Sequence, residues 1–110
     1  MPQFLIQFNY VSRAKRAMID HPEVDHAAQA GKMVASLGGK LLGYWYSFGN
    51  FDGVVLVEAL DHSTVAAITM AIGATGEVSR METIVLITME EAQKATSKAA
   101  TATHLPPSVA

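Results

Sequence analysis

The stretch KLLGYWYSFGNFDGVVLVEAL, residues 40–60, decides the fold of this chain. Aromatic and β-branched residues dominate residues 40–48 and 54–60, and such residues favour strands. Between them lies GNFDG, whose Gly, Asn and Asp are residues that turns prefer. Two runs of this kind joined by a short turn sequence predict an antiparallel β-hairpin.

The choice of turn sets which side chains share a face of the hairpin. With GNFDG as the turn, three cross-strand pairs are expected: Phe48 with Val54, Tyr46 with Leu56, and Tyr44 with Glu58. Tyr44, Tyr46 and Glu58 then lie on one face, and Trp45 points to the other. A shift of one residue in the pairing would reverse this assignment, because side chains alternate along a strand.

The segments around the hairpin complete a recognisable order of elements. The expected elements, in chain order, are a strand at 3–10, a short helix at 12–20, a helical segment from Pro22 to Gly38-Gly39, the hairpin, a helix at 63–74, a strand at 78–88 and a helix at 89–100. This order predicts an α+β, ferredoxin-like βαββαβ fold, with a four-stranded antiparallel sheet, helices on one face and an extra C-terminal helix. Residues 1–100 form one domain, and residues 101–110 are expected to be a flexible tail.

Apolar side chains are expected on both faces of the sheet, so both faces are expected to be buried. In the run VVLVEAL, residues 54–60, apolar side chains occupy both alternating sets, and Glu58 is the polar exception. The helices of this fold can cover one face, and an open face that is apolar favours contact with another protomer. The chain is therefore expected to form a homodimer or higher homo-oligomer, as in a dimeric α/β barrel.

Polar side chains on that open face are the candidate ligand-binding residues. They are expected to be Gln7, Asn9, Tyr44, Tyr46, Glu58 and Glu82. Apolar walls with a few polar groups are typical of small-molecule pockets. In one interpretation Glu58 is a general base or hydrogen-bond acceptor, and a tyrosine hydroxyl donates to the ligand. In the other, these groups satisfy one another across a protomer interface.

Composition excludes several function classes. Eight Lys and Arg against ten Asp and Glu give a net charge of −2, which argues against nucleic acid or an anionic membrane as partner. The chain has no Cys, so thiolate chemistry and Cys-based metal sites are absent. His21 and Asp25 have i, i+4 spacing and could share a metal, but His26 faces a different direction and no third ligand is evident. No metal site or cofactor is therefore expected. The N-terminus lacks the pattern of a signal peptide, and a cytoplasmic location is expected.

Four short motifs carry a family resemblance. They are Gly38-Gly39-Lys40-Leu41, Gly49-Asn50-Phe51-Asp52, Val57-Glu58-Ala59 and Arg80-Met81-Glu82-Thr83. With them, most of residues 3–91 resembles the GYD domain proteins, small bacterial and archaeal proteins named for a Gly-Tyr-Asp motif. Phe51 stands here where the naming tyrosine is expected, and residues 76–80 are about one residue longer than the family pattern. The resemblance implies a ferredoxin-like fold of the dimeric α/β-barrel type and no particular reaction.

Three functional hypotheses follow from this sequence. The first is a homo-oligomeric domain that binds a small molecule between its sheet and a partner protomer. The second is a cofactor-independent enzyme, of isomerase, oxygenase or decarboxylase type, that acts on a small aromatic or carbonyl substrate through Glu58 and Tyr44 or Tyr46. The third is a non-catalytic assembly module whose open face is only an interface. In all three, Gly49, Phe51 and Asp52 belong to the hairpin turn.

Overall fold

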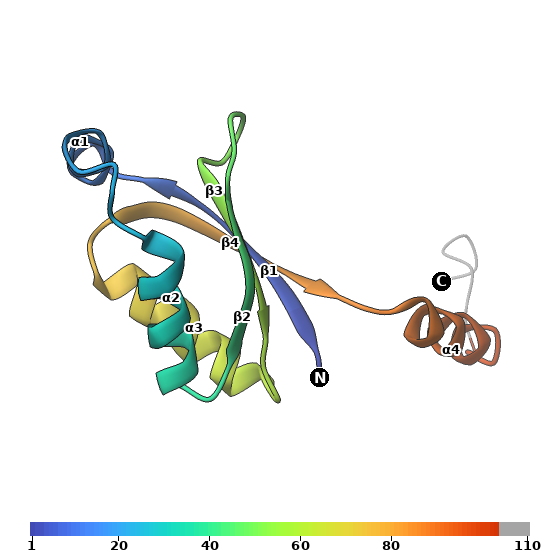
Figure 1. The fold of residues 1–110 in the computed structure, drawn as a ribbon. Helices are drawn as coiled ribbons and strands as arrows, with labels where there is room; N and C mark the ends of the chain where they lie inside the picture. Colours follow the sequence, from blue (N-terminus) through green and yellow to red (C-terminus); the bar gives the residue numbers. More distant parts are fainter. Residues whose placement is uncertain (104–110) are drawn as a thin grey trace.

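The chain folds around one antiparallel sheet, seen in a computed structural model that describes residues 1–103 (Figure 1). The strands are β1 (Gln3–Tyr10), β2 (Lys40–Tyr46), β3 (Gly53–Glu58) and β4 (Val78–Leu86). The helices are α1 (Ser12–Asp20), α2 (His26–Ser36), α3 (His62–Ala74) and α4 (Met89–Ala99). The expected C-terminal tail, residues 101–110, lies mostly outside the described residues.

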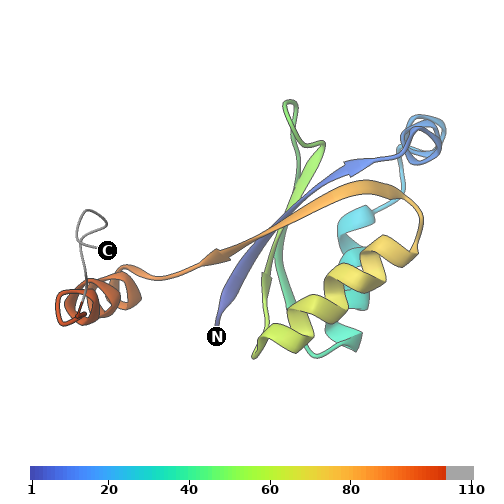
Figure 2. The ribbon, with the colours of Figure 1, turned by 180° about the vertical axis from the view of Figure 1, so that it is seen from behind.

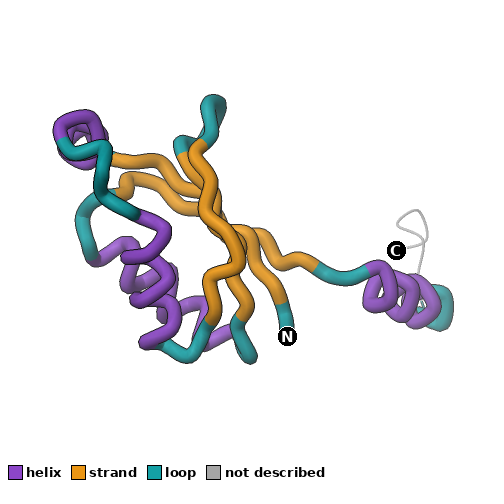
Figure 3. The backbone as a smooth tube through the Cα atoms, in the orientation of Figure 1, coloured by secondary structure: helices purple, strands orange, loops and turns teal. Residues whose placement is uncertain are grey.

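The four strands lie in the order β2-β3-β1-β4, and all neighbouring strands are antiparallel. Helices α2 and α3 lie side by side on one face of this sheet, as Figures 1 and 2 both show. Figure 3 shows that no helix covers the opposite face within the described part of the chain. This confirms the α+β, ferredoxin-like fold, which is the fold type of dimeric α/β barrels.

The core lies between the sheet and helices α2 and α3. Along β1 the buried side chains are Phe4, Ile6 and Phe8, which alternate with partly exposed ones. Val34 of α2 and Ile68 of α3 are buried against them. Burying large apolar side chains stabilises a fold by about 1.5–3 kcal/mol each, so this alternation fixes which face of β1 meets the helices.

The hairpin pairs in a different register from the expected one, and each partner of Tyr44 and Tyr46 lies three residues earlier in β3 than expected. Ser47 donates its backbone N–H to the carbonyl of Asp52 (2.8 Å), and Tyr46 pairs with Gly53. The loop is therefore Ser47–Asp52, and Tyr44 lies opposite Val55 on the helix side. A bulge near Leu42 restores the pairing of Lys40 with Glu58.

The expected placement of Tyr44 and Tyr46 on the open face is thus wrong, and so is that of Trp45 on the helix side. Trp45 pairs with Val54 and lies on the open face. The physical reason is the loop: its ends are closed by Ser47 and Asp52, so Gly53 becomes a strand residue, and the side chains of Tyr44, Trp45 and Tyr46 change face.

One helix start and one strand end also differ from expectation. Helix α1 begins at Ser12 as expected, after Val11. Helix α2 begins at His26 rather than at Pro22, because the carboxylate of Asp25 caps it by accepting the N–H of Ala28 (2.9 Å). Strand β4 ends at Leu86, because Thr88 caps helix α4 in a reciprocal capping box with Glu91.

Helix α4 stands apart from the rest of the molecule (Figure 1). None of its residues, all of which the structure describes, is buried. The molecule is elongated as a result, with extents of 60 × 31 × 22 Å. Among residues 1–103, no helix combines the length and the apolarity that crossing a bilayer requires.

Candidate small-molecule site between the sheet and its helices

All three tyrosines of the chain gather at one end of the sheet, on the helix side. Tyr10 ends β1, whereas Tyr44 and Tyr46 belong to β2. Phe8 packs edge-on against both Tyr10 and Tyr44, with ring centroids 5.2 and 5.9 Å away. Tyr44 and Tyr46 also pack edge-on, at 5.6 Å. Edge-to-face contacts of this kind stabilise aromatic groups beyond simple burial.

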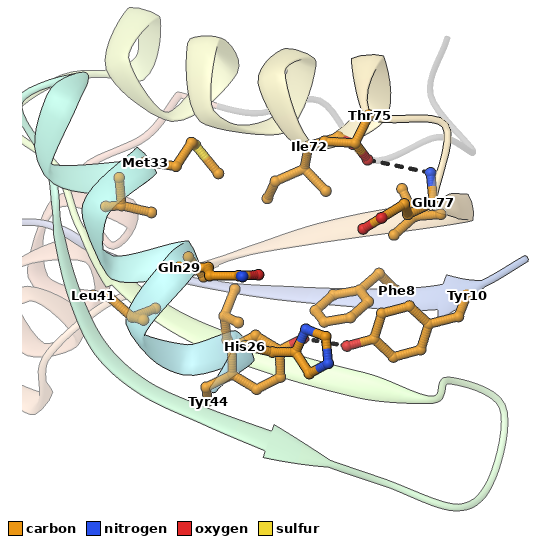
Figure 4. A pocket seen from close by; sticks show the side chains of 14 residues that line it. Phe8, Tyr10, His26, Gln29, Met33, Leu41, Tyr44, Ile72, Thr75 and Glu77 are labelled. Atoms are coloured by element: carbon orange, nitrogen blue, oxygen red, sulfur yellow. Dashed lines mark hydrogen bonds between the residues drawn. The ribbon is translucent and has the colours of Figure 1, made fainter. Parts of the chain in front are cut away.

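The hydroxyls of Tyr10 and Tyr44 form a hydrogen bond to each other (Figure 4). Burial raises the pKa of Tyr10, and the hydrogen bond to Tyr44 and nearby negative groups, including Glu77, raise it further. Burial also raises the pKa of Tyr44, whereas the hydrogen bond with Tyr10 lowers it. Both hydroxyls therefore keep their protons at neutral pH, and either of them can donate the hydrogen bond that they share.

A cavity of about 200 Å³, which we call the tyrosine cavity, lies beside this hydroxyl pair, between α2, α3 and the sheet. Figure 4 shows the tyrosine rings on its floor and Met33 and Ile72 on its helical walls. Its lining residues are Phe8, Tyr10, His26, Gln29, Ala30, Met33, Val34, Leu41, Tyr44, Val55, Ile72, Thr75, Glu77 and Val78. The walls are mainly apolar, and the polar groups are few, which is the composition of ligand pockets.

Besides the tyrosines, the polar groups around the cavity come from two places. His26 and Gln29 belong to the first turns of α2. Thr75 and Glu77 lie just after α3, where the hydroxyl of Thr75 accepts the backbone N–H of Glu77 (3.2 Å). Within the described part of the chain, the lining includes no Lys or Arg. A ligand there meets neutral hydroxyls, an imidazole and one carboxylate.

The residues of the expected turn motif serve to anchor the hairpin. The carboxylate of Asp52 accepts the backbone N–H of Tyr10 (3.0 Å), and it lies 3.4 Å from the ammonium of Lys15. Phe51 is buried, and the guanidinium of Arg80 lies 4.7 Å from its ring centroid, a cation–π distance. The packing of the Phe51 ring therefore does not depend on the hydroxyl that a tyrosine would have at this position. Gly49 is exposed in the loop.

Position 53 requires glycine because the backbone there lies close to the ring of Phe8, and not because its φ angle is unusual. A Cβ at this position would lie 2.8 Å from the ring of Phe8. The positive φ values among the described residues belong instead to Gly38 and Gly76, each following a helix. Gly53 thereby lets the hairpin close over Phe8 and beside the tyrosines.

Four of the six expected ligand-binding residues lie on the open face. Gln7 pairs with Glu82 across β1 and β4, and Asn9 pairs with Arg80. Glu58 pairs with Gln3 of β1, whose side-chain amide donates to its carboxylate at 3.5 Å. The sheet separates these residues from Tyr44 and from the cavity. Glu58 is therefore not brought together with a tyrosine hydroxyl.

Sequence reasoning missed Tyr10, His26 and Glu77 as site residues. Tyr10 continues the alternation of Phe4, Ile6 and Phe8, so its place on the helix side follows from the pattern. His26 and Glu77 carry no comparable signal, because their positions depend on how α2 and the loop after α3 meet the end of the sheet. His21 is elsewhere, 3.6 Å from the carboxylate of Glu23.

A second and more open hollow, of about 490 Å³, lies between α1 and the hairpin. Its lining residues are Tyr10, Lys15, Met18, Ile19, Tyr46, Ser47, Phe48 and Asp52. Tyr10 lines both this hollow and the cavity, so its ring forms part of the wall between them. Phe48 is fully exposed here. We refer to this hollow as the hairpin groove.

Comparison with solved structures shows the same fold at low sequence identity. The protein TTHA0845 from Thermus thermophilus is 19% identical, with a TM-score of 0.56 over 80% of this chain and 95% of that one. The 5-chloro-2-hydroxyhydroquinone dehydrochlorinase TftG from Burkholderia phenoliruptrix AC1100, in complex with 2,5-dihydroxybenzoquinone, is 11% identical, with a TM-score of 0.54 over 81% and 97%. FFRP-DM1 is 16% identical, with a TM-score of 0.52 over 79% and 100%.

Comparison with sequence families identifies the family of this chain. A search of curated proteins found no match. The family model of the GYD domain matches residues 4–96, which include nearly all of the sheet and the start of α4 as well as the residues of the cavity. The chain belongs to the GYD domain family.

Proposed function

We propose that this protein is a homo-oligomeric domain that binds a small, uncharged, mainly apolar molecule in the cavity behind Tyr10 and Tyr44. The observation that carries the proposal is the cavity itself, about 200 Å³, with a hydrogen-bonded hydroxyl pair in its wall. A pair of half-buried hydroxyls beside an apolar cavity offers both shape and a polar contact, which together are the basis of ligand recognition.

The size of the cavity limits the ligand. Typical sites for drug-sized molecules have volumes of roughly 300–1,000 Å³. A cavity of about 200 Å³ suits a molecule of about one ring. The aromatic side chains of Phe8 and Tyr44 lie in its wall and favour a planar ligand through edge-to-face or stacked contacts.

The polar groups of the cavity limit the chemistry of the ligand. In a pair of hydroxyls the accepting oxygen still has its own proton, so one hydroxyl of the Tyr10 and Tyr44 pair is available to donate to a ligand oxygen. The carboxylate of Glu77, with no Lys or Arg among the described lining residues, disfavours an anion. The preferred ligand is therefore a neutral single-ring molecule with a carbonyl or hydroxyl oxygen. That a protein of the same fold, TftG, is seen in complex with 2,5-dihydroxybenzoquinone supports the ligand's shape by analogy of fold alone.

Self-association is the second part of the proposal, and the open face supports it. Leu5, Leu56 and Ile84 form a continuous apolar row across β1, β3 and β4 on that face. Within the described chain no helix covers them. Gln7, Asn9, Glu58 and Glu82 lie around this row, and we propose that they make the polar contacts of an interface between protomers.

The ligand proposal is tested by binding phenol, benzaldehyde and benzoate to the purified protein, with calorimetry and thermal unfolding as readouts. Phenol and benzaldehyde are expected to bind and to raise the melting temperature, whereas benzoate binds much more weakly. Tyr44→Phe is expected to weaken phenol binding by about three- to tenfold, the effect of one hydrogen bond. Ala30→Phe, which fills the cavity, is expected to abolish it.

Tyr46→Phe is the matched control, because it removes the same atom from a tyrosine that does not line the cavity. Its affinity for phenol should equal that of the wild type. If phenol and benzoate bind equally well, and neither Tyr44→Phe nor Ala30→Phe changes the affinity, the ligand does not occupy this cavity and the proposal is wrong.

A catalytic function is the second candidate, because two ionisable side chains, His26 and Glu77, line the same cavity as the hydroxyl pair. A base and a hydroxyl donor around one bound carbonyl compound could move a proton between carbon and oxygen, an isomerase-type step. Glu77 and His26 would replace Glu58 in this role. Once a substrate is known, Glu77→Gln should remove turnover and leave binding intact; equal turnover would leave only the binding function.

A further inference from the structure

We infer that the C-terminal arm, residues 85–99, packs in the hairpin groove of a second copy of this chain. The inference rests on the homo-oligomer proposed above and specifies how two protomers engage. It concerns a surface that shares only Tyr10 with the tyrosine cavity. It explains two features that the described part of a single chain leaves without a partner: the isolated helix α4 and the exposed apolar side chains around Phe48.

The arm has an apolar side that is left uncovered among residues 1–103 of its own chain. Val85, Ile87 and Met89 alternate along it and are 59, 57 and 80% exposed. Helix α4 follows directly and, in the described chain, buries none of its residues. Isolated helices of about this length are only marginally stable in water. A complete capping box between Thr88 and Glu91 nevertheless caps the N-terminus of α4. Helix α4 is therefore a regular helix, and we expect it to be stabilised by packing against another surface.

The hairpin groove supplies a surface of the matching kind. Met18 and Ile19 of α1 form one side, and Tyr46 and Phe48 of the hairpin form the other. Ile19 is 68% exposed, and Phe48 is 103% exposed. A volume of about 490 Å³ admits several apolar side chains from a helix that lies along it. Exposed aromatic and aliphatic residues gathered at one hollow mark an interaction surface.

The arm and the groove of one chain lie at opposite ends of its sheet. Leu86 pairs with Gln3 where β1 begins, whereas the hairpin pairs Gly53 with Phe8 near the end of β1. Figure 1 shows α4 and α1 on opposite sides of the molecule. If two sheets face each other across a two-fold axis perpendicular to the strands, the end of β4 in one copy lies over the hairpin end of the other. The arm then reaches the groove of its partner.

Charge supports the same pairing. Helix α1, beside the groove, contains Arg13, Lys15 and Arg16 against Asp20. The first turn of α4 contains Glu90 and Glu91. An acidic helix start placed next to a basic helix is favourable and fixes the orientation of the contact.

The two-fold arrangement makes a second copy the natural occupant. Each chain has one arm and one groove, so a symmetric pair fills both grooves and leaves neither arm exposed. No additional partner is needed to complete this contact. The result is a dimer in which the wall of the tyrosine cavity, through Tyr10, is in part supported by the partner's arm.

The test uses the absence of Cys from the chain. Met89→Cys and Phe48→Cys are made in separate chains with different tags, the two are co-expressed, and the purified product is treated with a short bismaleimide cross-linker. A covalent pair containing both tags is expected. The matched control replaces Phe48→Cys with Met70→Cys, a side chain of α3 that is 73% exposed and far from the groove. It should give little mixed product.

Light scattering of the uncross-linked proteins separates the possible failures. A dimeric mass with mixed cross-linking no greater than in the Met70→Cys control would show that protomers associate without the arm, and the inference would be wrong while self-association stands. A monomeric mass would overturn both. If a chain carrying Met89→Cys and Phe48→Cys together cross-links only within itself when dilute, α4 occupies its own groove and the inference is also wrong.

Discussion

The hydroxyl groups of Tyr10 and Tyr44 are polar groups in the wall of the tyrosine cavity. Tyr10 and Tyr44 share one hydrogen bond inside an apolar wall, and Tyr46 packs against Tyr44 from the more exposed side. Burial is the largest cause that raises the pKa of each of the three. Because neutral hydroxyls are easier to bury than phenolates, the folded chain holds these protons more tightly than the unfolded chain does.

Stability should therefore depend on pH in the alkaline range. In the unfolded chain a tyrosine has a pKa of about 10. The stabilisation from Tyr10 and Tyr44 is fully present below about pH 10 and is lost as the pH rises towards the raised pKa of the folded state. We expect the free energy of unfolding, measured with urea between about pH 8 and about pH 11, to fall at the alkaline end.

The double variant Tyr10→Phe with Tyr44→Phe should reduce this fall, because it removes the groups that titrate. Tyr46→Phe should change it less, since Tyr46 is half exposed. An equal alkaline loss of stability in the double variant and the wild type would contradict the assignment of these protons.

At the scale of elements, Asp52 of the hairpin loop extends the pairing of β3 with β1 by one more residue. The carboxylate of Asp52 accepts the backbone N–H of Tyr10 at 3.0 Å, and the N–H of Asp52 donates to the carbonyl of Phe8 at 2.9 Å. These bonds continue the pairing of β1 with β3 beyond Gly53. They place Tyr10 beside Tyr44, so the hairpin loop assembles the hydroxyl pair.

Asp52→Ala should lower the free energy of unfolding by about 1–3 kcal/mol, because it leaves the N–H of Tyr10 without its acceptor. Asp52→Asn keeps an acceptor oxygen and should lose less. Lys15→Ala removes only the partly exposed ion pair with Asp52 and should cost about 0–1 kcal/mol. Urea unfolding of the three variants measures these differences, and an equal loss in Lys15→Ala and Asp52→Ala would show that the ion pair, and not the backbone contact, anchors the loop.

At the scale of the whole molecule, apolar side chains stay exposed on one face of the sheet and along the extended C-terminal segment. Helices α2 and α3 cover one face, and the other presents the row of Leu5, Leu56 and Ile84. A lone chain with its C-terminal helix extended has much apolar surface in contact with water. Association of protomers would remove that cost.

Leu5→Asp should shift the protein to a monomer, because it places a charge in the centre of the open face. Light scattering after size-exclusion chromatography measures the mass. Met70→Asp is the control, since Met70 is exposed on α3 and the change introduces the same charge on the helix side. An oligomer that survives Leu5→Asp unchanged would place the interface elsewhere.

The alternation of Phe4, Ile6 and Phe8 and the order of elements were enough to predict the ferredoxin-like fold, because burial requires one periodic set of side chains to face the helices. The same logic placed Gln7, Asn9, Glu58 and Glu82 on the open face, where the strand pairing has them. The family motifs indicated the GYD assignment, which the family model confirms. These properties are local or depend on simple periodicity.

The candidate site was not predictable in the same way. The face of Tyr44 and Tyr46 depended on where the loop closes, and the bonds of Ser47 and Asp52 that decide this join residues without a distinctive local pattern. His26 and Glu77 reach the cavity only because α2 and the loop after α3 meet the same end of the sheet. Sequence alone thus determined the family, the order of elements and the open face, since period-two burial is local. The tertiary structure decided the register of β2, the tyrosine pair and the cavity, because contacts between distant residues set them.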